Sequence, residues 1–117
     1  MSEIKISIVT SCYNCGPYLH ETCDSILSQN YKNWEWILID DFSEDNTQEI
    51  ISEVVERDDR IRKVMAEYKK QYWWNPQIAA TGDVFVHLDS DDKILPNTLN
   101  HINYYFNKFP DLYFLHF

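Results

Sequence analysis

Three aspartates lie within four residues of one another in the sequence Asp89-Ser90-Asp91-Asp92, which follows an apolar segment. Carboxylates this close repel one another, so the cluster is tolerable when it is fully solvated or when it holds a divalent cation. Its hard oxygen ligands suit Mg²⁺ or Mn²⁺, which also bridge carboxylates to a diphosphate. The alternative is an acidic turn that caps a helix beginning at Pro96. The apolar segment before the cluster and a second acidic group in the chain favour the metal site.

The second acidic group is Asp40-Asp41, which ends another apolar segment. It has three interpretations, namely a metal ligand, a carboxylate that recognises a base, and an acid at a helix start. A carboxylate in a pocket accepts hydrogen bonds from the ring N–H of uracil or a similar base, and an aromatic side chain such as Tyr13 stacks on the ring. Taken alone, Tyr13 is more typical of a half-buried aromatic residue at a strand end, and Asp41 of a helix cap.

The elements that position these groups follow from hydrophobic periodicity. Apolar runs predict strands at residues 4–10, 34–39, 61–66, 84–88 and 112–117. Apolar stripes at helical spacing predict three helices, with the buried positions Leu19, Cys23, Ile26 and Leu27 in the first, Ile50, Ile51, Val54 and Val55 in the second, and Leu99, Ile102, Phe106 and Phe109 in the third. Repeated β-α-β units imply an α/β fold of three layers, in which a mostly parallel sheet has helices on both faces.

The carboxyl ends of parallel strands share one edge of a sheet, and ligands of such folds bind there. Both acidic groups fall at strand ends, and so does the polar segment at residues 11–14. The sequence therefore predicts that three polar clusters, far apart in the chain, converge on one edge.

Composition narrows the function. The 117 residues allow one domain, and 19 acidic against 10 basic residues give a net charge of −9, which argues against a nucleic-acid partner. The only glycines, Gly16 and Gly82, are too few for a Walker A loop or a dinucleotide-binding fingerprint, so a bound phosphate would need a cation. The odd number of cysteines and the lack of a signal peptide or a long apolar run predict a cytoplasmic location.

Four segments resemble the inverting glycosyltransferases of family two, in the order and spacing of that family. They are residues 6–14 (ISIVTSCYN), 25–31 (SILSQNY), 36–47 (WILIDDFSEDNT) and 80–92 (ATGDVFVHLDSDD). The resemblance implies a GT-A fold that binds a nucleotide-diphosphate sugar. It also implies sugar transfer with inversion to a glycan or lipid-linked hydroxyl acceptor, in polysaccharide biosynthesis.

The resemblance assigns roles to particular residues. Ser11 and Tyr13 match the segment that contacts the base, and Asp41 matches the carboxylate that hydrogen-bonds it. Asp89 and Asp91 match the Asp-Xaa-Asp motif, with Asp91 as the ligand of Mn²⁺ or Mg²⁺ and Asp89 directed towards the ribose or the metal. The role of Asp92 is left open. UDP is favoured over dTDP and GDP, because the pair of Tyr13 and Asp41 suits uracil.

The chain departs from the family pattern in two ways. Trp73 stands near the position of an arginine that contacts the donor, and Lys69 or Lys70 is the nearest substitute. The catalytic domain of the family is also about twice as long as this chain. We therefore expect residues 1–117 to be a single partial domain that binds the donor, with the acceptor site and the general base beyond residue 117 and no catalytic residue assigned here. A truncated sheet edge would favour self-association. The full-length protein is expected in the cytoplasm or peripherally at the inner face of the membrane.

Two other functions fit parts of the sequence. An apolar strand followed by Asp-Xaa-Asp is similar to phosphatases of the haloacid dehalogenase type, in which Asp89 would be the nucleophile beside Mg²⁺. Cys12, Cys15, His20 and Cys23 approach the spacing of a small zinc-binding module. Apolar surroundings in the sequence favour core cysteines over zinc ligands.

Overall fold

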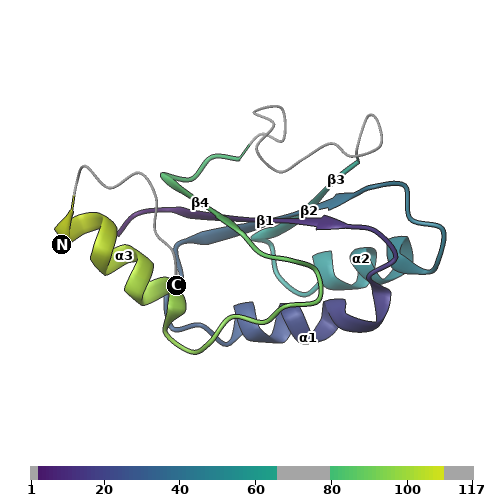
Figure 1. Ribbon diagram of the computed structural model, residues 1–117, viewed down its shortest axis with the longest axis horizontal. Helices are drawn as coiled ribbons and strands as arrows, with labels where there is room; N and C mark the ends of the chain where they lie inside the picture. Colours follow the sequence, from purple (N-terminus) through teal and green to yellow (C-terminus); the bar gives the residue numbers. More distant parts are fainter. Residues whose placement is uncertain (1–2, 66–79, 110–117) are drawn as a thin grey trace.

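The computed structural model describes residues 3–65 and 80–109 (Figure 1). Its strands are β1 (Ile6–Cys12), β2 (Trp34–Asp40), β3 (Ile61–Met65) and β4 (Val84–His87), and its helices are α1 (Gly16–Leu27), α2 (Thr47–Val55) and α3 (Thr98–Lys108). All strand pairs are parallel, in the order β3-β2-β1-β4. This order places β1, which leads into the polar segment, between the two strands that lead into the acidic groups.

Local sequence explains where the elements begin and what they bury. Every residue of β2 is buried, in agreement with its nearly continuous apolar sequence. Pro17 lies in the first turn of α1, where its missing N–H is not needed for a helical hydrogen bond. At the start of α2, the side chain of Asp45, one residue before the N-cap Asn46, accepts a hydrogen bond from the Thr47 N–H at 2.9 Å and so satisfies one of the free N–H groups of the first turn.

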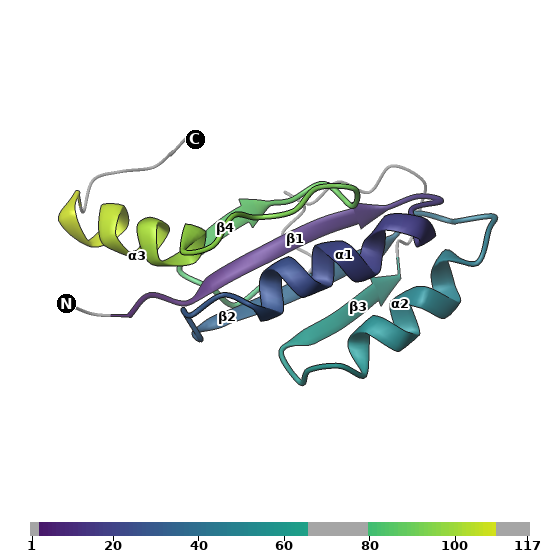
Figure 2. The same cartoon turned by 90° about the horizontal axis from the view of Figure 1, so that it is seen from below.

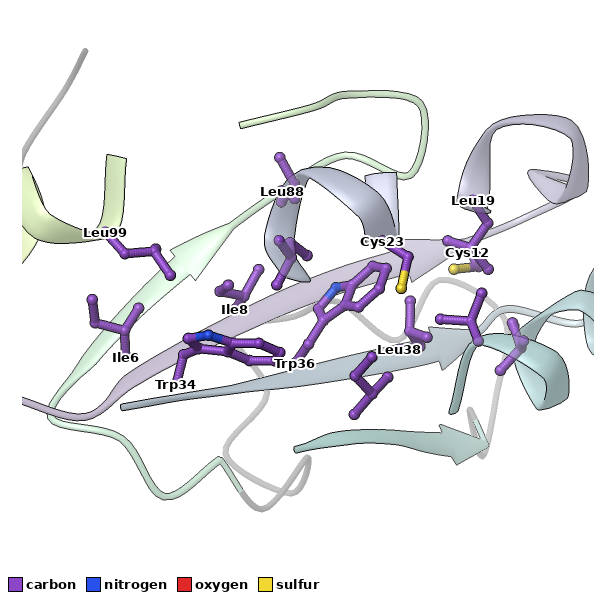
Figure 3. Packing of buried hydrophobic residues seen from close by; sticks show 14 of the residues in the cluster. Ile6, Ile8, Cys12, Leu19, Cys23, Trp34, Trp36, Leu38, Leu88 and Leu99 are labelled. Atoms are coloured by element: carbon purple, nitrogen blue, oxygen red, sulfur yellow. The ribbon is translucent and has the colours of Figure 1, made fainter. Parts of the chain in front are cut away.

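The main core lies between the sheet and α1, with α2 on the same side (Figures 1 and 2). Figure 3 shows Ile8, Trp36 and Leu38 of the sheet together with Leu19 and Cys23 of α1. α3 lies near the beginning of β1, away from the strand ends that carry the acidic groups. A smaller cluster of buried residues lies on the opposite face, and within the described ranges no helix covers it. The core therefore leaves the carboxyl edge of the sheet accessible.

The predicted α/β fold with a mostly parallel sheet is confirmed. Within residues 3–65 and 80–109 the helices lie on one face of the sheet, so the predicted helical layer on the second face is not seen in this part of the chain. β1 continues to Cys12, beyond the predicted end at Thr10, and the helix expected from Pro96 begins at Thr98. The predicted strand at residues 112–117 and the segment around Trp73 lie outside the described residues. Within the described part of the chain, no helix combines the length and the hydrophobicity needed to span a membrane.

Glu35 is an acidic side chain near the start of the mostly apolar strand β2, and it holds the segment before β4 in place. Its Oε2 accepts hydrogen bonds from Ser7 Oγ at 2.6 Å and from the N–H and hydroxyl of Thr81 at 2.6 and 3.0 Å. On the other oxygen, Arg62 Nη2 lies 3.3 Å from Oε1. Burial disfavours the charged carboxylate, but the hydrogen bonds from Ser7 and Thr81 outweigh it and lower the pKa of Glu35 to about 2.

We expect this carboxylate to make the unfolding free energy of the chain depend on pH in the acidic range. A group whose pKa is lowered by folding stabilises the native state above its ordinary value of 4.5, and this contribution is lost as the pH falls towards 2. The loss approaches about 3 kcal/mol of unfolding free energy. Urea denaturation near neutral pH and at acidic pH should show this loss of unfolding free energy in the wild type but not in Glu35→Gln. Glu56→Gln, at an exposed position, is the matched control, and equal acid sensitivity in Glu35→Gln and wild type would contradict the prediction.

Candidate functional site

The carboxyl ends of β1 and β4 border an open pocket of about 290 Å³. Parallel pairing of the two strands brings its walls together, since Val9 lies opposite His87 and the Leu88 N–H donates to the Val9 carbonyl at 3.0 Å. The residues that line the pocket are Ser11, Tyr13, Asn14, Cys15, Tyr18, Asp89, Ser90 and Asp91. The structure thus brings together Ser11, Tyr13, Asp89 and Asp91 as the sequence predicts, and their individual roles stay predictions.

Asp41 lies beside this pocket but is not among its lining residues. Its backbone N–H donates to the carbonyl of Cys12 at 2.7 Å, which fixes the end of β2 next to the end of β1. The neighbouring Asp40 is buried, and one of its carboxylate oxygens accepts the Ser43 N–H at 3.2 Å. Its other oxygen has no hydrogen-bond partner in the described part of the chain. Of the three predicted clusters, the Asp40-Asp41 pair therefore contributes least to the pocket wall.

A tight turn between β1 and α1 forms the first wall. The Asn14 backbone has a positive φ of 50°, a conformation that asparagine tolerates. Its N–H donates to Ser43 Oγ at 3.1 Å, and its side-chain oxygen accepts the Glu44 N–H at 2.8 Å. Thr47 Oγ1 accepts the N–H of Cys15 at 3.0 Å. These contacts tie the turn to the start of α2 and hold the first wall in one conformation.

Two tyrosines stand on this wall with about half of their surface free. Tyr13 is 51% exposed and Tyr18 is 53% exposed. Sequence reasoning identified Tyr13 and missed Tyr18, which follows Gly16 and Pro17 in the first turn of α1 and so shares the edge reached by the strand ends. A helix start directly after a polar strand end was the signal that could have revealed it. Exposed aromatic rings at a pocket suit stacking with a planar ligand.

The second wall is the acidic turn, residues 89–92. Carboxylate oxygens of Asp89, Asp91 and Asp92 all lie within 4.8 Å of one another, and all three residues are exposed. At that separation in water, two negative charges repel by about 1 kcal/mol. Desolvation and the charges of Asp89 and Asp91 raise the pKa of Asp92. Lys93 lies 3.4 Å from Glu21, so its ion pair is with α1. A divalent cation would relieve the repulsion, and the set of three oxygens fits one.

The pKa values of the three cysteine thiols shift in different directions, according to the surroundings of each. Hydrogen bonding to Cys15 and burial raise the pKa of Cys12. The same hydrogen bond and another to Ser90 lower the pKa of Cys15, which lines the pocket. Burial raises the pKa of Cys23, in the core, to about 11. Of the three thiols, Cys15 is therefore the one that combines a lowered pKa with a place at the pocket.

The zinc ligands of the alternative interpretation do not come together. Cys12, Cys15 and Cys23 are free and buried, and the ring of His20 lies 3.0 Å from Glu53 on the next helix. Across residues 3–65 and 80–109, only the acidic turn brings three or more histidine, cysteine, aspartate or glutamate side chains close enough to share a metal ion. The alternative of a zinc-binding module is therefore wrong.

Comparison with known sequences identifies relatives. The family model for glycosyl transferase family 2 matches residues 7–116. The glycosyltransferase GlyG of Streptococcus pneumoniae is 40% identical over 102 residues, which are 85% of this chain and 34% of GlyG. WfaP of Escherichia coli, a UDP-Glc:alpha-D-GlcNAc-diphosphoundecaprenol beta-1,3-glucosyltransferase, is 39% identical over 90 residues, 74% of this chain and 35% of WfaP. The chain spans about a third of the length of these relatives.

Solved structures share the fold. TarS of S. aureus superimposes with a TM-score of 0.76 at 24% identity, over 89% of this chain and 32% of TarS. The mannosyltransferase PcManGT of Pyrobaculum calidifontis gives 0.75 at 21% identity, over 88% of this chain and 32% of that protein. These likenesses show the GT-A fold, and together with the family match they make the phosphatase alternative wrong. The sequence segments, the parallel sheet and the family match agree that this chain belongs to glycosyl transferase family 2.

Proposed function

We propose that this chain binds the donor substrate of a glycosyltransferase, a nucleoside-diphosphate sugar, with UDP as the favoured nucleotide. The observation that carries the proposal is the pocket, which has two exposed tyrosines on one wall and a cluster of carboxylates on the other. A base stacks on exposed aromatic rings, and a diphosphate is held at carboxylates through a divalent cation. The name of WfaP specifies UDP-Glc, and TarS has been solved with UDP-GlcNAc and with UDP, which supports this choice.

In this proposal the residues of the first wall hold the nucleoside. Ser11 and Tyr13 contact the base, with Tyr13 stacking on it. Asp41 accepts a hydrogen bond from the ring N–H, and the bond of its backbone to the Cys12 carbonyl, next to Tyr13, supports this role. Asp89, on the opposite wall, faces the ribose or the cation.

The acidic turn would hold the cation, which we propose to be Mn²⁺ or Mg²⁺. Asp91 and Asp89 are its ligands, and the proximity of the Asp92 carboxylate makes Asp92 a third candidate. When bound, such a cation neutralises charge on the diphosphate that leaves during sugar transfer. The structure of PcManGT was solved with GDP-Man and Mn²⁺, which supports a divalent cation in this fold.

The full reaction needs more than this chain. Transfer with inversion requires a base that removes the proton of the acceptor hydroxyl while that hydroxyl attacks the anomeric carbon opposite the leaving diphosphate. We propose that the base and the acceptor site lie beyond residue 117, that the acceptor is a glycan or a lipid-linked sugar, and that the protein acts at the cytoplasmic side. The name of WfaP contains a lipid-linked acceptor, which supports a lipid-linked sugar as the acceptor.

We also retain self-association as a proposal for the isolated chain. β4 is at the edge of the described sheet, and Phe85 on it is 56% exposed. An edge strand with an exposed aromatic side chain favours pairing with a second copy. A clean monomer in light scattering at high concentration would contradict this.

Calorimetric titration with UDP in the presence of Mn²⁺, and again with EDTA, tests the proposed function. We expect UDP to bind weakly and only with the metal, because the acidic turn repels the bare diphosphate. UMP is the matched control, since its single phosphate should show far less dependence on the metal. Equal binding of UDP in EDTA would contradict the role of the acidic turn, and no binding of UDP or GDP under either condition would contradict the nucleotide site.

A further inference from the structure

A polar stripe on α1 and just after it faces the segment that follows β4. Thr22, Ser25 and Gln29 are spaced so that they lie along one side of the helix. Thr22 and Gln29 are 1% exposed, which is unusual for polar side chains on a surface helix. Their partners beyond β4 are Ser90 and Asp92 for Thr22, Ile94 for Ser25, and Leu95 and Leu99 for Gln29. The stripe thus fastens residues 90–99 to α1.

Thr22 is the member of the stripe that holds the acidic turn. Its hydroxyl lies 2.7 Å from the carbonyl oxygen of Asp92 and 3.1 Å from that of Ser90, on the two sides of Asp91. A third carbonyl, that of Tyr18 in the same helix, lies 3.2 Å from the hydroxyl. A hydroxyl has one proton, so the nearest carbonyl, that of Asp92, is the main acceptor, and the carbonyls of Ser90 and Tyr18 compete for the same proton. Because Thr22 is buried, its hydroxyl cannot readily replace this contact with one to water.

The acidic turn needs such a restraint. The turn itself is closed by one backbone hydrogen bond, from the Asp92 N–H to the Asp89 carbonyl at 3.1 Å. Its three carboxylates lie within 4.8 Å of one another and repel, so without a cation their mutual charge pushes the turn open. A fixed backbone keeps the ligands together before a cation arrives, which lowers the entropic cost of binding.

We propose that Thr22 is a positioning residue, whose hydroxyl fixes the backbone on both sides of Asp91 so that the carboxylates of the acidic turn face a cation together. The inference rests on the proposed function, because it concerns the same cation, but it assigns a role to a helix residue that is not among the pocket-lining residues. Thr22 acts through Asp91 and makes no contact with the cation itself.

Thr22→Val, which keeps the shape and removes the hydroxyl, tests the proposal on the 117-residue chain. NMR relaxation of the backbone amides of Ser90, Asp91 and Asp92 in the metal-free chain should show increased motion. The affinity for Mn²⁺, measured from the electron paramagnetic resonance signal of the free ion, should fall by roughly five- to tenfold, the effect of losing one hydrogen bond. Thr22→Ser keeps the hydroxyl and should match the wild type in both measurements.

Gln29→Leu is the control for general loss of stability, because it removes tethers to Leu95 and Leu99 but none to the acidic turn. It should lower the melting temperature and leave Mn²⁺ affinity unchanged. Unaltered motion and affinity in Thr22→Val, or an equal loss of affinity in Gln29→Leu, would overturn the proposal. If Thr22→Val does not fold, Thr22→Ala takes its place. It must then bind Mn²⁺ more weakly than the wild type, while Thr22→Ser must match the wild type. Equal Mn²⁺ affinities of Thr22→Ala and the wild type would overturn the proposal. Failure of the wild type to bind Mn²⁺ would count against the proposed function, while the relaxation data still decide the role of Thr22.

Discussion

Alanine in place of Asp91 is expected to abolish the Mn²⁺-dependent binding of UDP, with a loss of affinity of roughly 100-fold or more. Asp91 lines the pocket and stands at the centre of the acidic turn, between two carboxylates within 4.8 Å. Its removal leaves too few negative charges to hold a cation against water, and the diphosphate then meets only the repulsion of Asp89 and Asp92. Calorimetry with UDP and Mn²⁺ measures the effect directly.

The same substitution should not weaken the fold. Asp91 is exposed and the neighbouring acids repel it, so the alanine variant should have a melting temperature equal to or slightly above that of the wild type without metal. Asp59→Ala removes one negative charge at an exposed position outside the pocket and should bind UDP normally. Binding by Asp91→Ala that matches the wild type would show that the acidic turn is not the cation site.

Alanine at Gly82 is expected to cost about 3 kcal/mol of unfolding free energy or more. A Cβ atom there would lie 2.8 Å from both the Lys5 carbonyl oxygen and the Ser7 backbone nitrogen, and closer still to Ser7 Oγ. The φ angle of Gly82 is not positive, so the requirement is for space and not for glycine's conformational freedom. The backbone of β1 cannot move aside without breaking its pairing with β2 and β4.

Gly16→Ala provides the matched control. Its Cβ would also be crowded, at 2.8 and 2.9 Å, but by the side-chain ends of Asn46 and Ile50, which can move. Urea denaturation followed by circular dichroism should therefore show a much smaller loss for Gly16→Ala than for Gly82→Ala. Similar losses in the two variants would mean that the close approach at Gly82 is relieved by a shift that the structure does not indicate.

Strands and helices were predictable because burial leaves a periodic record in the sequence. The apolar runs at residues 4–10 and 34–39 predicted the two central strands, which the structure places at Ile6–Cys12 and Trp34–Asp40. The stripe through Leu19, Cys23 and Ile26 became the buried face of α1. The convergence of Tyr13 and the acidic turn also followed from the sequence, because parallel strands must end at one edge.

Contacts between residues that are far apart in the chain were harder to predict from the sequence. Glu35 stands out in the sequence as an acid within an apolar strand, but its partners Ser7 and Thr81 come from two distant segments. Thr22 looks like an ordinary polar helix residue until the fold places the acidic turn beside it. For Asp41 the sequence predicted more than the structure shows. Its position at a strand end predicted a pocket residue, but it is not among the residues that line the pocket.

The strand order also has a consequence for how the binding region assembles. Thr22 and Asp92 are 70 residues apart in the chain, and the two walls meet only after β4 docks against β1. Any molecule that touches both walls therefore binds the completed fold and not its earlier intermediates. By linkage, its binding free energy is added to the docking of β4, so this edge strand of the described sheet is held more firmly while the ligand is in place.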